Sequence, residues 1–182
     1  MKNQKILFFD IDGTLLTAPP FSVPESTQLA LKKAREKGHL LFVNSGRTLA
    51  MISPLIRDLG FDGYVCGCGS QIYMHDELLY SSTIPNELCR ETIDILRQCG
   101  IAAFFEQPGG ILYDGASPAR CLDVEHLKDA VKAVDLSAFS PEEMGTFTFD
   151  KFLAFFLKDS NEEKFQKFCE ENYLYFDHGN RI

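Results

Sequence analysis

Three features of this 182-residue sequence predict an α/β fold with a doubly wound parallel sheet, followed by an α+β unit. Short apolar runs alternate with amphipathic segments in the first part, in the order strand, helix, strand, helix, strand. After Gly69 the pattern changes to hairpins and separated helices. The 45% of hydrophobic residues allow a substantial core. We expect two domains, residues 1–82 and 83–182, with the boundary near Ser82.

The first part contains three apolar runs, each short enough to be a strand that is covered on both faces. We expect these strands at residues 6–9, 39–44 and 63–67. Between the first two lies a helix for which Ser22 and Glu25 fit a capping box, and Gly38 can end it in a left-handed conformation. Its apolar positions are Leu29, Leu31 and Ala34. A second helix is expected from about Thr48 to Leu59, before Gly60.

The second part reads as hairpins and helices with a different periodicity. A hairpin over residues 71–84 would turn at His75-Asp76, and a helix over 85–99 would end at Gly100. The remaining expected elements are an antiparallel pair around the turn 108–110, a helix near Val124–Val134, a strand within 151–158, a helix over 161–171 capped by Ser160 and Glu163, and a last strand at 173–177.

Charge and composition exclude several classes of partner. The net charge of −8 argues against nucleic acid or an anionic membrane as a partner, because both are bound through basic patches. Apolar runs are too short to span a bilayer, and Asp10 interrupts the first run too early for a secretory signal. Six irregularly spaced cysteines indicate reduced thiols rather than a disulfide framework. We therefore expect a cytoplasmic protein.

Two carboxylates stand at the end of the first predicted strand, in the stretch KILFFDIDGTLL. Asp10 and Asp12 are two positions apart, so in an extended segment their side chains point the same way. The carboxyl ends of strands are where open α/β sheets bind ligands, and Gly13 permits a sharp turn there. Carboxylates this close repel unless a cation joins them, and oxygen ligands suit Mg²⁺. With Mg²⁺, one carboxylate can attack phosphorus while the other transfers a proton, which indicates phosphoryl transfer.

Two stretches resemble motifs of the haloacid dehalogenase (HAD) superfamily. FFDIDGTLL resembles the first motif in its DxDGT phosphatase form, and LLFVNSGRT resembles the second in the Ser-Gly-Arg variant of Cof-type sugar-phosphate phosphatases. The resemblance implies a HAD-like Rossmannoid core, of which only the N-terminal half is present, and an α+β cap. It also implies that Asp10 is the nucleophile and a Mg²⁺ ligand. Asp12 would be the general acid/base and bind the metal through its backbone carbonyl. Ser45 would hold the phosphoryl group, with Gly46 and Arg47 beside it.

Simpler roles stay open for several of these residues. Ser45 can also cap the helix that begins nearby, and Arg47 can pair with a surface acid instead of binding phosphate. Cys66 and Cys68 are expected to share a strand face as packed thiols, since no second Cys or His pair completes a zinc site. Arg120 can serve as a specificity residue of the cap or as a solvated loop charge.

The family's third motif, a lysine, and its fourth, an acidic pair that completes the Mg²⁺ site, have no counterpart after the cap. Without further strands beside it, the run Ile6–Phe9 should be an exposed apolar edge. The chain is then a piece of a longer phosphatase, a short protein that forms a homodimer through this edge, or a protein completed by a separate chain. We expect little or no turnover from it, because missing electrostatic groups cost orders of magnitude in rate.

The function that the sequence favours is Mg²⁺-dependent hydrolysis of a small phosphorylated metabolite, such as a sugar phosphate, through an aspartyl-phosphate. Two alternatives remain open. One is a non-catalytic protein that binds a phosphometabolite or regulates a partner, and the other is a phosphotransferase similar to the phosphomutases. The loops of the cap have no pattern that identifies the substrate.

Overall fold

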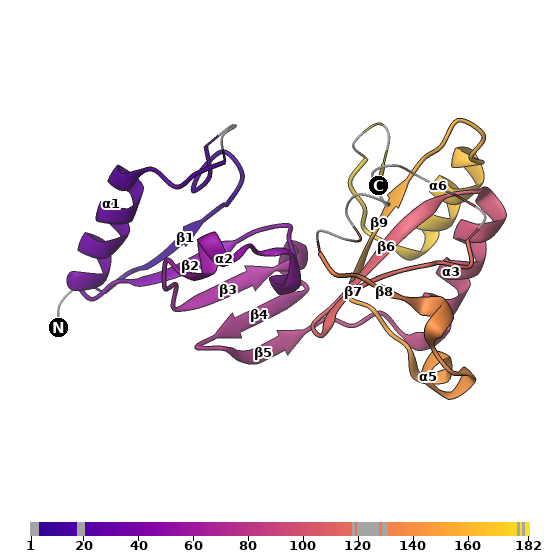
Figure 1. Cartoon of the computed structure of the whole chain (residues 1–182), viewed down its shortest axis with the longest axis horizontal. Coiled ribbons are helices and arrows are strands. Elements are labelled where there is room, and N and C mark those ends of the chain that lie inside the picture. Colours follow the sequence, from indigo (N-terminus) through magenta and orange to yellow (C-terminus); the bar gives the residue numbers. More distant parts are fainter. Residues whose placement is uncertain are drawn as a thin grey trace. The chain divides into compact units, whose positions relative to one another are not determined.

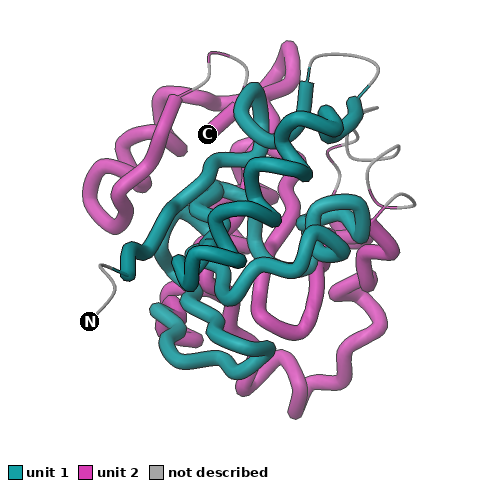
Figure 2. The backbone as a smooth tube through the Cα atoms, turned by 90° about the vertical axis from the view of Figure 1, so that its left-hand side faces the viewer, with its two compact units in different colours: residues 1–82 teal, residues 83–182 magenta. Residues whose placement is uncertain are grey.

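The computed structural model describes residues 4–17, 21–117, 119, 128, 131–177, 179 and 181–182. The chain forms two compact units, residues 1–82 and 83–182 (Figure 2). Each unit has its own β-sheet and its own cluster of buried hydrophobic side chains. The predicted α/β class is confirmed.

The first unit contains a five-stranded sheet in the order β1-β2-β3-β4-β5 (Figure 1). Its strands are β1 (Ile6–Phe9), β2 (Leu40–Asn44), β3 (Gly63–Cys66), β4 (Gln71–Met74) and β5 (Glu77–Ser81). The first three strands are parallel, and β4 and β5 continue the sheet as an antiparallel hairpin. The predicted turn at His75-Asp76 is confirmed, and both residues have positive φ, as a tight hairpin requires.

Helix α1 (Glu25–Glu36) lies between β1 and β2 in the chain, and its predicted end is confirmed because Gly38 has a φ of +81°. The predicted capping box is wrong. Pro24 is the N-cap and no side chain caps the helix, whereas the Ser22 hydroxyl lies 3.3 Å from the Thr17 hydroxyl. The helix begins at Glu25, which leaves Ser22 outside the N-cap position.

The predicted helix over Thr48–Leu59 is also wrong. The structure has a 3₁₀ turn, η1 (Leu49–Met51), and one turn of α-helix, α2 (Pro54–Arg57). Pro54 disfavours helical backbone at the residue before it, and Ser53 is extended, with a φ of −63° and a ψ of 153°. The proline therefore starts a new helix instead of continuing one.

The core of this unit lies around β2, where Leu41 and Val43 have no exposed surface. Strand β1 is at the end of the sheet and pairs only with β2 among the described strands. Its side chains Ile6 and Phe8 are 53% and 56% exposed. The expected apolar edge is thus present, and the Phe8 ring packs on Phe42 at a centroid distance of 5.5 Å.

The second unit contains a four-stranded sheet in the order β8-β7-β6-β9 (Figure 1). Its elements among the described residues are α3 (Asn86–Cys99), β6 (Ala102–Gln107), β7 (Gly110–Tyr113), β8 (Val134–Asp135), the 3₁₀ turn η3 (Leu136–Ala138), α5 (Pro141–Thr146), β9 (Lys151–Phe155) and α6 (Glu162–Asn172). The predicted helix before Gly100, the antiparallel pair and the strand within 151–158 are confirmed. Buried phenylalanines, with Phe105 and Phe149 at 5.0 Å, form its centre.

Two expectations for this unit are wrong. Asn161, not Ser160, caps α6 through Lys164 N, because the Ser160 hydroxyl instead donates to the Gly100 carbonyl. Residues 173–177 are not a strand. The chain pairs with β9 further on, where Ile182 and Ala154 exchange two backbone hydrogen bonds of 2.6 and 3.0 Å.

Helix α5 was not predicted, although Ser140 and Glu143 form a capping box and Pro141 occupies its first turn. The helix expected near Val124–Val134 falls mostly outside the described residues. Within its last part, residues 131–132 form a turn and Val134 begins β8. No described helix has both the length and the apolar character needed to cross a membrane.

Candidate functional site

Asp10 and Asp12 lie at the carboxyl end of β1, on either side of a buried residue. Ile11 is 1% exposed and anchors the turn, since its carbonyl accepts the backbone N–H groups of Leu15 and Leu16 at 3.0 and 2.9 Å. Both aspartates are exposed, and the Asp12 side chain is 56% accessible. Gly13 has a φ of +77°, which explains why glycine suits this position. The turn therefore holds two carboxylates at the solvent side of the sheet end.

Ser45 follows the last residue of β2 and is 6% exposed. Its backbone N–H donates to the Val65 carbonyl at 2.9 Å, and its hydroxyl accepts the Arg47 N–H at 3.2 Å. The hydroxyl therefore holds the loop that follows it but caps no helix, since Thr48 is the N-cap of η1 and Ser53 that of α2. A hydroxyl can still donate its own proton, so this contact leaves Ser45 able to bind an anion.

A second loop, which the sequence did not reveal as part of the site, lies against the Ser45–Arg47 loop. Residues 67–69 follow β3, and the N–H groups of Gly67 and Cys68 donate to the carbonyls of Arg47 and Ser45 at 2.9 and 3.3 Å. A Cβ added at Gly46 would lie 3.4 Å from the Cys68 sulfur. The signal available in the sequence was the pair of glycines around Cys68 at a strand end.

The two cysteines of this region are not equivalent, so the expectation of packed thiols on one strand face is wrong for Cys68. Cys66 lies in β3 and has no exposed surface, and burial raises the pKa of its thiol to about 12. Cys68 is exposed and lies beyond the strand, with a φ of +58°. The left-handed backbone turns its side chain out of the register of β3.

Arg47 and Asp12 form a bidentate ion pair that joins the ends of β1 and β2. Arg47 Nη2 lies 2.7 Å from Asp12 Oδ1, and Arg47 Nε lies 3.0 Å from Asp12 Oδ2. The residues are 35 positions apart, and the Arg47 side chain is 36% accessible. Arg47 thus pairs with an acid, and that acid is the candidate proton donor.

The donor set around Asp10 fits a partial Mg²⁺ site. Within the described residues no group of three or more His, Cys, Asp or Glu side chains could hold a metal ion. Mg²⁺ often takes only one or two carboxylates and completes its shell with water and substrate phosphate. Arg47 contacts both oxygens of Asp12, so the exposed Asp10 carboxylate is the acid of this turn that could take a cation, and the Asp12 backbone carbonyl is the second ligand that the family resemblance implies.

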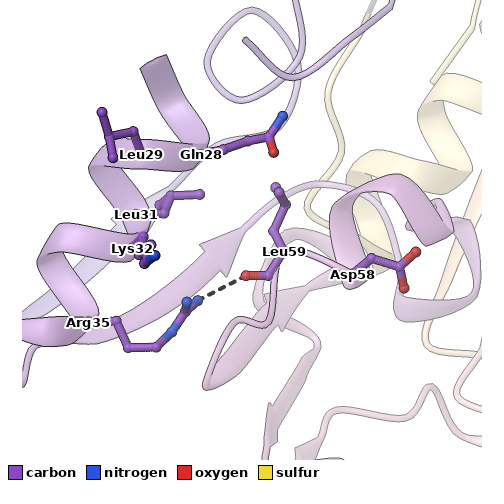
Figure 3. Close-up of a pocket in the computed structure, with 7 residues that line it drawn as sticks. All are labelled: Gln28, Leu29, Leu31, Lys32, Arg35, Asp58 and Leu59. Atoms are coloured by element: carbon purple, nitrogen blue, oxygen red, sulfur yellow. Dashed lines mark hydrogen bonds between the residues drawn. The ribbon is translucent and has the colours of Figure 1, made fainter. Parts of the chain in front are cut away.

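A hollow of about 390 Å³ lies elsewhere in the first unit (Figure 3). It is lined by Gln28, Leu29, Leu31, Lys32, Arg35, Asp58 and Leu59. The Arg35 guanidinium donates to the carbonyls of Leu59 and Gly60 at 2.9 and 2.6 Å, so it serves the local fold. Gly60 precedes β3, whereas Ser45 follows β2, so these residues are at opposite ends of parallel strands. Arg120 lies outside the described residues.

Residues 7–179 match the family model described as haloacid dehalogenase-like hydrolase. Among curated proteins, the chain is similar to the HMP-PP phosphatase of Serratia proteamaculans (strain 568), with 26% identity over 125 residues, which are 68% of this chain and 45% of that protein. It is also similar to the pyridoxal phosphate phosphatase YbhA of Escherichia coli (strain K12), with 27% identity over 115 residues, 62% of this chain and 42% of that protein. The chain thus matches less than half the length of these two relatives.

Among solved structures, the fold is similar to that of BT4131, which is described as a HAD subclass IIB sugar phosphatase. The TM-score is 0.70 and the identity 25%, over 93% of this chain and 64% of that one. The family match extends over almost the whole chain and includes both aspartates and the Ser45–Arg47 loop. The chain therefore belongs to the haloacid dehalogenase-like hydrolase family and has the Cof-type pattern within it.

Proposed function

We propose that this chain carries the nucleophile and phosphate-binding half of a Mg²⁺-dependent phosphatase for small phosphorylated metabolites. The observation that supports this most is the Arg47–Asp12 ion pair, because it links the acidic turn after β1 to the Ser45 loop after β2. Two motifs that are separate in the sequence are thus neighbours at one end of a parallel sheet, where α/β proteins bind ligands.

The proposed chemistry assigns one role to each aspartate. An Asp10 carboxylate oxygen forms a bond to phosphorus, and the bond between phosphorus and the ester oxygen breaks. The departing oxygen takes a proton from the Asp12 carboxyl. In the second step a water molecule gives a proton to the Asp12 carboxylate as its oxygen attacks phosphorus, and the bond between Asp10 and phosphorus breaks. Phosphate leaves and both side chains return to their first state.

Mg²⁺ would be held by the Asp10 carboxylate and the Asp12 carbonyl, and its charge would reduce the repulsion between an anionic nucleophile and an anionic substrate. The Ser45 hydroxyl, the Gly46 backbone and the Arg47 guanidinium would bind the phosphoryl oxygens. The unit of residues 83–182 would act as the cap and the unit of residues 1–82 as part of the catalytic core.

Two relatives are named for HMP-PP and pyridoxal phosphate, and a solved neighbour is named a sugar phosphatase. These names support a small phosphorylated metabolite, such as a sugar phosphate, as the substrate. The five described cysteines are all free thiols, which supports a cytoplasmic location. We also propose that β1, which is the end of its sheet, pairs with a second copy of the chain.

Trifluoroberyllate, which imitates a phosphoryl group on a carboxylate, tests the proposed nucleophile even if turnover is slow. We expect a bound ¹⁹F NMR signal that requires Mg²⁺ and disappears in Asp10→Asn. Asp58→Asn is the matched control, because it removes the same charge from an exposed aspartate at the end of α2. A bound signal that survives in Asp10→Asn, or that never forms in the unaltered chain, would contradict the proposal.

A further inference from the structure

The side chain of Arg47 forms an ion pair with Asp12, and two hydrogen bonds hold its backbone in place. The backbone N–H donates to the Ser45 hydroxyl at 3.2 Å, and the backbone carbonyl accepts from Gly67 N–H at 2.9 Å. Only the guanidinium reaches across to the turn after β1, where it occupies both oxygens of Asp12. Rotation of this side chain can therefore break the ion pair without moving either loop.

The guanidinium adds a positive charge to the acidic turn after β1. Asp10 and Asp12 flank Ile11, and a positive group on Asp12 lowers the attraction of this turn for any other cation. The same guanidinium suits phosphate, since its planar fork binds two phosphate oxygens as readily as it binds a carboxylate. The Arg47 side chain thus opposes the binding of a cation and favours the binding of a phosphate group.

We propose that Arg47 is the resident counter-ion of Asp12, and that the chain exchanges it for a divalent cation and a phosphoryl group. In the free protein Arg47 opposes cation binding and keeps the Asp12 carboxylate engaged. When a phosphoryl group arrives, the guanidinium transfers to its oxygens, and the released Asp12 carboxylate takes up from solvent the proton that it later gives to the departing oxygen. Arg47 is then a positioning residue for Asp12 in one state and a phosphate ligand in the other. This inference rests on the proposed function, because both ligands belong to it.

The test measures two affinities that should change in opposite directions in Arg47→Met. Mn²⁺, followed by the electron paramagnetic resonance signal of the free ion, replaces Mg²⁺ as the probe. We expect Mn²⁺ to bind roughly fivefold to tenfold more tightly, because a unit positive charge near the site has been removed. With Mn²⁺ saturating, inorganic phosphate followed by calorimetry should bind about tenfold more weakly, since a charge-assisted bidentate contact is lost.

Two further variants separate charge from structural damage. Lys33→Met removes one positive charge from the exposed side of α1 and should leave both affinities within twofold of the unaltered chain. Arg47→Lys keeps the charge but loses the fork, so it should leave Mn²⁺ affinity near the original value and still weaken phosphate. Loss of both affinities in Arg47→Met would show a merely structural role and overturn the inference.

The outcomes also distinguish this inference from the proposed function. Mn²⁺ binding that Asp10→Asn abolishes but Arg47→Met leaves unchanged overturns the inference alone. Binding that appears only in Arg47→Met supports it strongly, since the guanidinium would then block the site. Absence of Mn²⁺ binding in the unaltered chain and in Arg47→Met overturns both the inference and the proposed metal site.

Discussion

Cys66 shows how one buried side chain makes the stability of its unit depend on pH. Burial raises the pKa of this thiol from 9.0 to about 12. Below pH 9 the thiol is protonated in the folded and the unfolded chain, so its contribution to stability is fully present. Between pH 9 and pH 12 only the unfolded chain loses the proton, so stability falls as the pH rises.

We therefore expect the free energy of unfolding to fall by about 1 kcal/mol between pH 8.5 and pH 10 through Cys66 alone. Urea denaturation followed by circular dichroism at the two pH values measures this decrease. Cys66→Ala should have the smaller decrease, whereas Cys68→Ala, at an exposed position, should decline like the unaltered chain. If the free energy of unfolding fell equally in all three proteins, Cys66 would not be the source of the pH dependence.

Single residues also show which parts of the site could be predicted. The positions of Asp10, Asp12 and Ser45 at strand ends follow from local apolar runs, so the sequence alone places them. The pairing of Arg47 with Asp12 depends on the two strands being neighbours in the sheet, and that order is a property of the whole fold. The exposed position of Cys68 depends on a left-handed backbone, which a non-glycine residue rarely adopts.

Among the secondary-structure elements, the helices had the least predictable boundaries. Prolines and competing hydrogen bonds explain this. Pro54 divided one expected helix into two short turns, and Ser160 bonded to Gly100 instead of capping α6. Helix α1 shows a different error, because Leu29 and Leu31 looked equally suited to the core. Leu31 is 3% exposed and belongs to the core cluster of the first unit, whereas Leu29 is 52% exposed.

Because Leu31 is buried and Leu29 is exposed, truncating these two side chains of α1 should change stability by different amounts. Leu31→Ala should lower the free energy of unfolding by about 2 to 4 kcal/mol, because it removes a fully packed side chain and leaves a cavity. Leu29→Ala is the matched control and should cost less than about 1 kcal/mol, since much of the side chain is already in water. Urea denaturation at constant m-value measures both. A Leu29 effect as large as that of Leu31 would show that the outer face of α1 is covered.

At the scale of the whole molecule, the parallel strands of the first sheet and the antiparallel hairpin that extends it were visible in the sequence, whereas the parallel pairing of β7 with β8 was not. Continuous apolar runs gave the parallel strands, and the hairpin turn gave the antiparallel ones. The pairing of Ile182 with Ala154 could not be predicted, because it joins an irregular segment to β9 by two backbone hydrogen bonds. Contacts of this kind depend on tertiary structure and leave no periodic pattern.

Strand β1 forms one edge of the first sheet. The Lys5 carbonyl accepts the Leu40 N–H, so the alternate residues Ile6 and Phe8 direct their backbone groups away from β2. An antiparallel pair of β1 strands about a two-fold axis would place Ile6 of one copy opposite Phe8 of the other. Both exposed side chains would then lie on one face of a continuous sheet. This arrangement buries the apolar surface that β1 leaves open.

Light scattering after size-exclusion chromatography should therefore give a mass that rises with protein concentration toward that of a dimer. Each copy has a net charge of −8, so the two copies repel and added salt should favour the dimer. Phe8→Lys should prevent the association. Leu79→Lys, with the same 56% exposure at the other end of the sheet, should not. A monomeric mass at every salt and protein concentration would contradict the pairing, because an apolar edge associates more strongly as repulsion is screened.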